Sequence, residues 1–306
     1  MPRSGTNSAY SSKLAKYLLK RALYFLILLL CVSFLIFAVT DPLIGRAAAV
    51  TPRGGMSYFM RYGVWLRAIL FGRTGDLSRQ GRSLFTHFGT LIPGTIKLAG
   101  ASLAMIVIVS FPLGLLAALK KDSLFDYGLR SLSFLFVSIP NFSLGFLLIY
   151  FFAVKMRWFS VIGDGGPRSL VLPVCALSIP LIARYVRQIR ATILEELHQE
   201  YVAGAIARGL RPWRVVFLHI LPNAMPGILT YLGISIGNLI NAVAVIETVF
   251  IWRGVGAIAV LSIRTLDYPM IQAYVLWMAL LYIVSNLIID TINHLSAPQR
   301  RPREAT

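Results

Sequence analysis

Residues 195–222 read EELHQEYVAGAIARGLRPWRVVFLHILP, a polar stretch between two long apolar segments. Its glutamates and arginines cannot all lie in hydrocarbon, so we predict that it is exposed on one side of a membrane. Gly209 is placed like a residue just past a helix C-terminus, and Pro212 suits the first turn of a new helix. We therefore expect two short helices joined by a tight turn.

The first of these helices carries a patch of very small side chains: Ala203, Gly204, Ala205 and Ala207. Small residues let another protein approach a helix backbone closely, and flanking charges set the register of such a contact. The pattern is compatible with a docking segment. The alternative, on the pattern alone, is a solvated connector without a partner.

The spacing of Ala205, Gly209, Leu221 and Pro222 resembles the cytoplasmic "EAA" loop of permeases in ATP-driven importers. More narrowly, residues 201–226, YVAGAIARGLRPWRVVFLHILPNAMP, resemble the dipeptide, oligopeptide and nickel permease family. In that family the loop forms a coupling helix that docks in a groove of a separate ATPase subunit. The resemblance implies this role for Tyr201, Ala203, Gly204, Ala205, Gly209, Leu210, Pro212, Leu221 and Pro222.

The stretch departs from the general loop pattern at three positions. Ala203 stands where many permeases have Glu, Gly204 where they have Ala, and His219 where an aliphatic residue is usual. Loss of the Glu is familiar in the peptide branch, so the resemblance stands. A specific salt bridge from this position to an ATPase is not implied.

Composition indicates a polytopic helical membrane protein. The chain has 306 residues, of which 57% are hydrophobic and 14% charged, with a mean hydropathy of +0.72. The apolar residues come in blocks of about twenty, the length that crosses a bilayer as a helix. The net charge of +18 is spread between these blocks, as the positive-inside rule predicts, and not gathered into a nucleic-acid-binding patch.

The predicted fold is an all-α integral membrane protein with six transmembrane helices and both termini cytoplasmic. Asp41-Pro42 is expected to end the first span, and a helix over residues 58–71 is expected to lie in the membrane interface. A kink is expected at Ser138–Asn141 in the third span. The expected segments are a cytoplasmic N-terminus 1–21, a first span 22–40, a periplasmic loop 41–91, a permease core 92–293 with spans at 92–119, 129–154, 170–185, 225–250 and 271–292, and a cytoplasmic tail 294–306.

Polar residues in or beside the spans are candidates for a solute pathway or gate: Asn141, Asn238, Asn241, Glu247, Asp267, Asn286 and Asp290. Two pairs, Asn238 with Asn241 and Asn286 with Asp290, have the spacing that places both members on one helix face. Interhelical hydrogen bonding is the alternative for the first pair and a helix-end charge for Asp290. For Glu247 the alternative is a structural hydrogen bond in the external turn.

Residues 246–290 and the SIPNF motif at 138–142 also resemble the same permease family, although Arg253 takes a place usually held by Pro. The resemblance implies a type I ABC importer permease in a bacterial inner membrane, the first of two homologous permeases. It implies two ATPase subunits that bind ATP and Mg, and a periplasmic or lipid-anchored solute-binding protein. Short peptides are the first expected solute, followed by nickel or another metal chelate.

No motif for bond-making chemistry is found in the chain. The nearest approach to a phosphate-binding loop, residues 89–95, lacks the required lysine. The two cysteines and four histidines have no metal-ligand spacing, so we expect no metal or cofactor in this chain and no enzyme activity. An ATP-independent secondary transporter or channel is the alternative function; an intramembrane enzyme would need a catalytic constellation that the sequence lacks.

Overall fold

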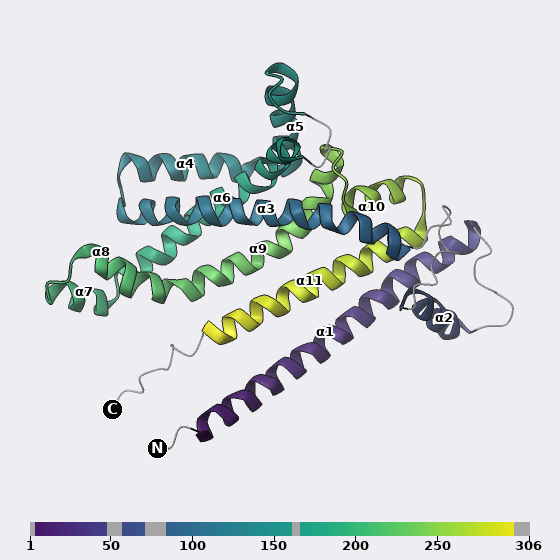
Figure 1. Cartoon of the computed structure of the whole chain (residues 1–306), viewed down its shortest axis with the longest axis horizontal. Coiled ribbons are helices and arrows are strands. Elements are labelled where there is room, and N and C mark those ends of the chain that lie inside the picture. The colour runs from purple at the N-terminus through teal and green to yellow at the C-terminus, as the bar shows by residue number, and fades with distance from the viewer. Residues whose placement is uncertain (1–3, 48–56, 71–83, 161–165, 297–306) are drawn as a thin grey trace. The chain divides into compact units, whose positions relative to one another are not determined.

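The computed structural model describes residues 4–47, 57–70, 84–160 and 166–296, and all regular elements in these ranges are helices (Figure 1). By contacts the chain forms two compact units. Unit 1 combines Met1–Gly89 with Ala259–Thr291, and unit 2 combines Thr90–Ile258 with Ile292–Thr306. The Gly163–Gly165 part of the third-to-fourth span loop and the tail beyond residue 296 lie outside the described residues.

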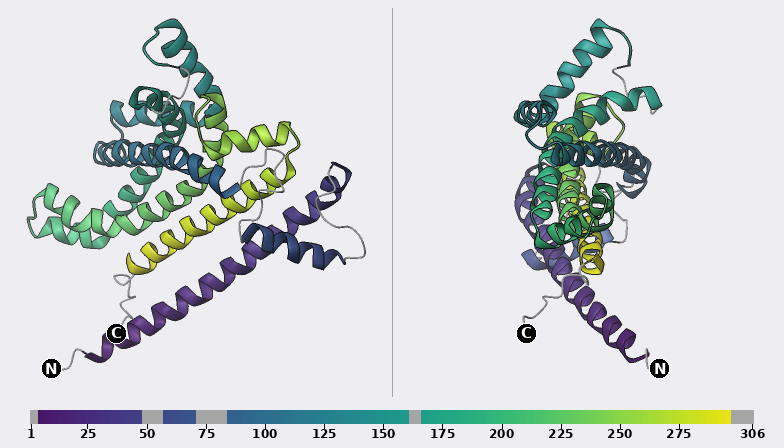
Figure 2. Two further views of the ribbon diagram at one scale, coloured as in Figure 1. Left: turned by 45° about the vertical axis from the view of Figure 1, so that its right-hand side comes forward. Right: turned by 90° about the vertical axis from the view of Figure 1, so that its left-hand side faces the viewer.

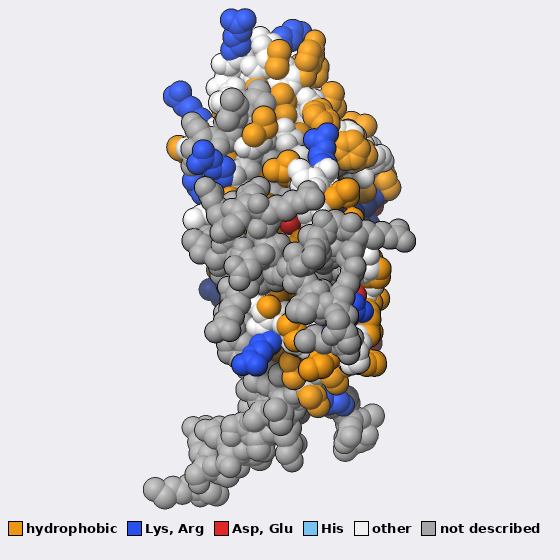
Figure 3. Space-filling view, turned by 90° about the vertical axis from the view of Figure 1, so that its right-hand side faces the viewer, with side chains coloured by type: hydrophobic (Ala, Val, Ile, Leu, Met, Phe, Trp, Pro, Cys, Tyr) orange, Lys and Arg blue, Asp and Glu red, His pale blue; other side chains and the backbone are white. Residues whose placement is uncertain are grey.

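Five helices in the described ranges are long and apolar enough to cross a membrane, and a sixth span results if one bent helix pair is counted. Large hydrophobic side chains remain on the surface of these helices, among them Leu35, Ile108 and Phe134, with exposed fractions of 67%, 70% and 62%. Hydrophobic side chains also gather over the described surface in Figure 3. A helix that is apolar on its outer side suits lipid or another membrane subunit.

Unit 1 is held together by a buried polar contact between three helices: α1 (Ser4–Ala47), α2 (Tyr58–Leu70) and α11 (Tyr268–Ser296). Trp65 Nε1 on α2 donates to Gln272 Oε1 on α11 at 2.8 Å. The Gln272 Nε2 in turn donates to Thr40 Oγ1 on α1. Gln272 is 2% exposed, so its amide serves both neighbours away from water.

The prediction that the helix cannot continue past Asp41-Pro42 is wrong, because α1 continues to Ala47 with Pro42 inside it, although the apolar span itself covers Leu23–Leu43. Proline removes only one backbone donor, and neighbouring groups can hold the helix in place around it. Thr40 Oγ1 donates to Ile36 O at 2.6 Å, and the Asp41 carboxylate pairs with Arg61 of α2 at 3.2 Å. These contacts keep the last turns of α1 helical.

The helix expected over residues 58–71 is present as α2 and packs on α1 through aromatic rings. The ring of Tyr62 lies 5.4 Å from that of Phe34 and 5.5 Å from that of Phe37, centroid to centroid. Tyr62 also shares a 2.6 Å hydrogen bond with Ser33 Oγ. Its position in a membrane interface stays a prediction.

Unit 2 is a bundle in which α6 runs along both α4 and α9 (Figures 1 and 2). Its elements are α3 (Leu84–Leu119) from Thr90 onward, α4 (Leu124–Ser138), α5 (Asn141–Leu148), the π-helix η1 (Ile149–Lys155), α6 (Pro167–Leu197), α7 (Glu200–Ala207), α8 (Pro212–Val215), the π-helix η2 (Val216–Ile220), α9 (Leu221–Val249) and the start of α10 (Val255–Arg264). The core is mainly aliphatic, with Leu177, Ile189 and Ile228 each at most 1% exposed. Gly114 lets α3 approach α6 closely, since a Cβ there would lie 2.8 Å from Ile189.

The kink expected in the third span is a full break. Ile139 is extended (φ −89°, ψ 122°) and Pro140 precedes α5, so the helices on either side differ in direction by 99°. Proline disfavours the helical conformation of the residue before it and offers no backbone N–H to continue the ladder. The helix that contains the fourth expected span, α6, extends beyond residue 185 through Arg190 to Leu197.

Candidate functional site

The turn predicted from Gly209 and Pro212 is confirmed between α7 and α8. Gly209 has φ +75°, a conformation that glycine adopts without a Cβ penalty, and its N–H donates to Ile206 O at 2.9 Å. Leu210 N donates to Ala205 O at 3.3 Å, which satisfies another carbonyl at the end of α7. Pro212 then occupies the first turn of α8.

The expectation that the second helix is short is wrong. From Pro212 the chain continues through η2 into α9, and helix extends without a break from Pro212 to Leu239 and beyond. Pro222 has no N–H for an ordinary bond to the Leu218 carbonyl, and its ring would crowd that group. The π-helical turn accommodates it, with Leu221 N donating to Val216 O. The α7–α8 turn is therefore attached directly to the long helix.

The patch of small residues on α7 is divided between two faces. Ala205 is 1% exposed and packs inward with Val202, so it does not share an exposed surface with the other small residues, and its role in coupling stays a prediction. Ala203, Gly204 and Ala207 face outward. A Cβ at Gly204 would meet no atom within 4 Å. We call Ala203, Gly204 and Ala207 the docking face.

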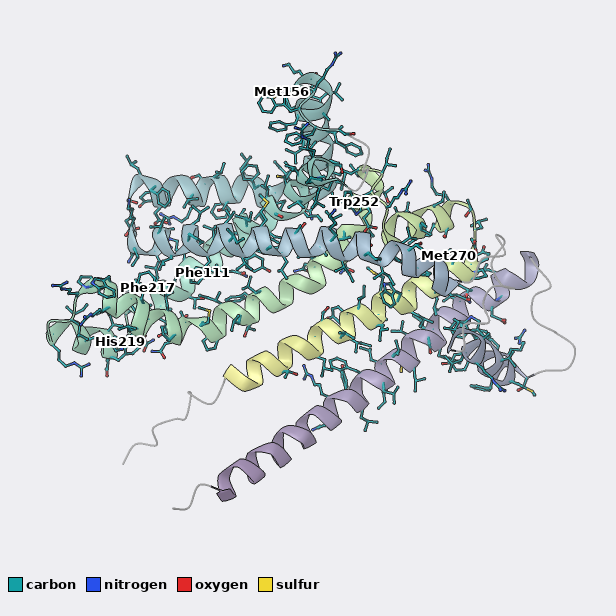
Figure 4. The ribbon with its side chains drawn as sticks, viewed as in Figure 1. Phe111, Met156, Phe217, His219, Trp252 and Met270 are labelled. Atoms are coloured by element: carbon teal, nitrogen blue, oxygen red, sulfur yellow. The ribbon has the colours of Figure 1, made fainter. Side chains whose placement is uncertain are left out.

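Charges of opposite sign lie at the two ends of the docking face. Glu195 and Glu200 are exposed where α6 passes into α7. Three exposed arginines follow at the other end: Arg208, Arg211 and Arg214. Exposed apolar side chains continue from this turn, including Trp213 (54%) and Phe217 (55%). Figure 4 shows Phe217 and His219 at this end of unit 2.

Tyr201 ties α7 to the end of α6. Its hydroxyl donates to Glu196 Oε2 at 2.8 Å. Burial and the neighbouring Glu196 carboxylate raise the pKa of Tyr201, so the phenol stays protonated and keeps this bond at neutral pH. Of the other residues implied for coupling, Leu221 is buried, Leu210 is half-buried and Pro222 is exposed.

The pathway candidates are divided between the two units. Asn238 and Asn241 are exposed on α9, and Asn141 is half-buried at the start of α5. The other three, Asp267, Asn286 and Asp290, belong to unit 1, and the side chain of Asp290 is not among those that the structure describes.

The unit 1 candidates have local structural partners. Asp267 Oδ1 accepts from Met270 N at 3.4 Å in the first turn of α11, as a helix-capping carboxylate does. Asn286 Nδ2 donates to Tyr282 O of its own helix at 2.8 Å. The side chain of Asp290 lies outside the described part of the chain.

Glu247 makes the structural hydrogen bonds that were the alternative to a gating role. Its side chain is fully buried at the end of α9. Oε1 accepts from Thr95 Oγ1 of α3 at 2.6 Å, and Oε2 accepts from Gly256 N at 2.8 Å and Ala257 N at 3.2 Å. A carboxylate so enclosed does not meet a solute in this structure.

Sequence reasoning missed an ion pair between α4 and α6. Arg190 binds Asp126 through two hydrogen bonds, and Arg130 lies 3.7 Å from the same carboxylate. The available signal was Ser123-x-x-Asp126 before an apolar run, a capping-box spacing. Ser123 Oγ does accept from Asp126 N at 3.3 Å. Within the described ranges no group of three His, Cys, Asp or Glu could hold a metal ion.

Comparison with known proteins gives concordant matches. Residues 110–302 match the family described as "Binding-protein-dependent transport system inner membrane component". The chain is 31% identical over 306 residues to the metal-staphylopine import system permease protein CntB of Staphylococcus aureus, covering 94% of this chain and 98% of that protein. It is 33% identical over 258 residues to the di/tripeptide transport system permease protein DppB of Pseudomonas aeruginosa, covering 75% and 77%.

The fold is similar to a solved structure as well. A chain of the MetNI methionine ABC transporter, in an inward-facing conformation, superposes with a TM-score of 0.58. The match covers 69% of this chain and 97% of that one at 18% sequence identity, so it bears on the fold alone.

Proposed function

The chain belongs to the inner membrane components of binding-protein-dependent transport systems, and from that premise we propose that it forms one half of a solute pathway driven by partner ATPases. A second, homologous permease completes the pathway, and a binding protein outside the membrane delivers the solute. Both termini lie in the cytoplasm, which places the α7–α8 turn on the cytoplasmic side.

The observation that carries the proposal is the docking face with its rigid attachment. Ala203, Gly204 and Ala207 are exposed and small, so a groove of another protein can reach the α7 backbone. The buried side of the same helix, Val202 and Ala205, anchors it to unit 2. A surface that is open on one side and firmly packed on the other can both bind a partner and pass on its displacement.

The charges at the two ends of α7 differ in sign, so they favour one orientation of a docked partner. With Ala203 in place of the usual Glu, the nearest charges are Glu200 at one end of α7 and Arg208 and Arg211 at the other. We infer that the ATPase groove is acidic beside the arginines and basic beside Glu200. Complementary charges of this kind set register and association rate more than affinity.

Displacement of α7 reaches the membrane spans along two routes. One is the continuous helix from α8 through η2 to α9. The other is α6, whose Arg190 is bonded to Asp126 of α4. Motion imposed on the docking face therefore moves packed helices as units, as an alternating-access cycle requires.

The solute is a short peptide or a metal chelate. Relatives named for di/tripeptides and for metal-staphylopine support these two classes. The exposed candidates on α9, Asn238 and Asn241, are amides, which can pair with the amide and carboxylate groups that both classes offer. A pathway lined by such amides can pass a metal chelate without binding its metal directly.

A pull-down of the tagged chain in mild detergent tests the assembly, with the Gly204→Leu variant as a probe of the docking face. Leucine at Gly204 points into open space, so the fold tolerates it while a docked ATPase does not. Gly128→Leu is the matched control, because Gly128 is also helical, exposed and without neighbours within 4 Å. We expect wild type and Gly128→Leu to recover ATPase and a second permease, and Gly204→Leu to lose the ATPase.

Equal recovery of ATPase by both variants would contradict the docking face. Recovery of the chain alone, active in solute movement without ATP, would instead support a secondary transporter.

A further inference from the structure

The turn between α9 and α10 is built around the buried Glu247 carboxylate. Val255, Gly256 and Ala257 open α10, and their N–H groups have no partner within that helix. Glu247 Oε2 takes two of these donors, and Thr95 Oγ1 accepts the third, from Val255 N at 3.0 Å. A carboxylate at a helix N-terminus is also favoured by the helix dipole.

Thr95 connects this cap to a third helix. Its hydroxyl accepts from Val255 and donates to Glu247 Oε1, so a single side chain of α3 binds both α9 and α10. Beside it, Trp252 Nε1 donates to Gly94 O at 3.0 Å. Four hydrogen-bonded residues from distant parts of the sequence thus meet at one point: Gly94, Thr95, Glu247 and Trp252. We call these four residues the Glu247 clamp.

Glycines around the clamp are required by close approach. A Cβ at Gly254 would lie 2.0 Å from Glu247 Oε1, and one at Gly256 would lie 2.3 Å from Ala244 Cα. A Cβ at Gly94 would lie 2.0 Å from Arg253 O. The backbone therefore packs directly against the Glu247 carboxylate, and α3, α9 and α10 have little freedom to separate here.

The clamp lies at the opposite end of α9 from the docking face. In Figure 1 the α7–α8 turn is at one end of unit 2 and the α9–α10 turn at the other, and Figure 4 places Phe217 and Trp252 in the same way. A long helix that is pushed at one end transmits a defined rotation only if its other end is held. If both ends were free, the same push would slide or tilt the helix without a fixed result.

We propose that Glu247 and Thr95 are positioning residues that hold the outer end of α9 to α3 and α10, so that α9 pivots there when an ATPase displaces the docking face. This inference rests on the proposed function. It gives Glu247 a mechanical role in the transport cycle without any contact with solute.

The test uses the assembled importer in nanodiscs and a reporter that needs no known solute. Asn241, exposed on α9, is replaced by cysteine in a background with Cys31→Ala and Cys175→Ala. Its reaction rate with a membrane-impermeant maleimide is measured without nucleotide and after trapping with ATP and vanadate. The ratio of the two rates reports the nucleotide-driven movement of α9, and ATP hydrolysis is measured in parallel.

Thr95→Val is the decisive variant, because it keeps the shape of the side chain and removes both hydrogen bonds to α9 and α10. We expect hydrolysis to continue while the difference between the two labelling rates is lost, so that their ratio falls from its wild-type value to about one, because two hydrogen bonds that hold α9 are missing. Thr95→Ser should restore the ratio. Thr248→Val is the matched control, since this exposed hydroxyl bonds only its own helix, donating to Ala244 O at 3.0 Å.

Glu247→Gln is a second variant, with one acceptor oxygen where the carboxylate has two, and should give a partial loss. A rate ratio equal to the wild-type value in Thr95→Val would overturn the pivot. The pivot would also be overturned if ATP hydrolysis and the rate ratio fell together in Thr95→Val and Glu247→Gln, because a purely structural role predicts that result. A wild-type complex without any response to ATP would overturn the proposed function itself, and the pivot with it.

Discussion

Arg190 on α6 holds the carboxylate of Asp126 on α4 by two parallel hydrogen bonds, from Nε to Oδ1 at 2.6 Å and from Nη2 to Oδ2 at 2.7 Å. Asp126 is fully buried, and its Oδ2 also accepts from Asp122 N at 3.1 Å in the α3–α4 turn. One carboxylate therefore joins the connection between α3 and α4 to the helix that leads into the docking face. A bidentate arginine–carboxylate pair of this kind fixes the relative orientation of the two side chains as well as their distance.

Replacing Asp126 should destabilise the protein more than replacing any exposed acid near it. Asp126→Asn leaves the Arg190 guanidinium, 14% exposed, without its counter-charge, and breaking such a pair costs about 3 kcal/mol. Thermal unfolding in detergent measures the loss, with Asp122→Asn as the control because the Asp122 side chain is exposed in the same turn. Equal melting temperatures for the two variants would show that the pair contributes nothing to stability.

Gly209→Val should uncouple ATP hydrolysis from transport while the chain still inserts. A β-branched residue at φ +75° costs roughly 1–2 kcal/mol and distorts the turn between α7 and α8. Transport per ATP is the measurement. Gly128→Val, at an exposed helical glycine with free space around it, is the control for the change of side chain alone. Wild-type coupling in Gly209→Val would rule out a role for the turn.

Reversing the charge of the turn should slow association with the ATPase. Arg208→Glu with Arg211→Glu is expected to reduce the association rate about tenfold at low salt, because an acidic groove would then repel the turn. The reduction should shrink as ionic strength rises and screening increases. Titration of ATPase into permease nanodiscs at two salt concentrations measures this, with Lys121→Glu as a control on an exposed residue of another turn. A salt-independent difference would argue against charge complementarity.

Gln272→Leu should lower the stability of unit 1 towards thermal unfolding. The substitution leaves Trp65 Nε1 and Thr40 Oγ1 buried without their shared partner, at a cost of about 1–3 kcal/mol. Trp65→Phe removes one of these groups, so the double variant should lose less stability than the sum of the two single variants. Additive losses in thermal unfolding would mean that the amide does not link the helices.

Local features of the sequence predicted most of the helices and the turn of the docking segment. Apolar blocks of membrane-crossing length indicate spans wherever they occur, since a helix satisfies its own backbone in hydrocarbon. The turn after α7 follows from Gly209 and Pro212, whose backbone preferences act over a few residues. Family membership could likewise be anticipated from short motifs.

Other outcomes depended on neighbours far away in the chain. Pro42 and Pro140 are both prolines in apolar segments, yet α1 continues through the first and the third span breaks at the second. Contacts of Thr40 and Asp41 hold α1 together, whereas Ile139 has adopted the extended conformation that a following proline favours.

The roles of the buried acids were decided only by tertiary structure. Asp126 meets Arg190 across 64 residues of sequence, and Glu247 meets Thr95 across 152. Ala205, one residue from the exposed Gly204, turns inward for the same reason, because packing selects which face of a helix is covered. Helix formation is determined by short-range backbone and side-chain preferences that the sequence carries by itself. The partner of a buried polar group is determined by which helices pack together, and that is known only once the chain has folded.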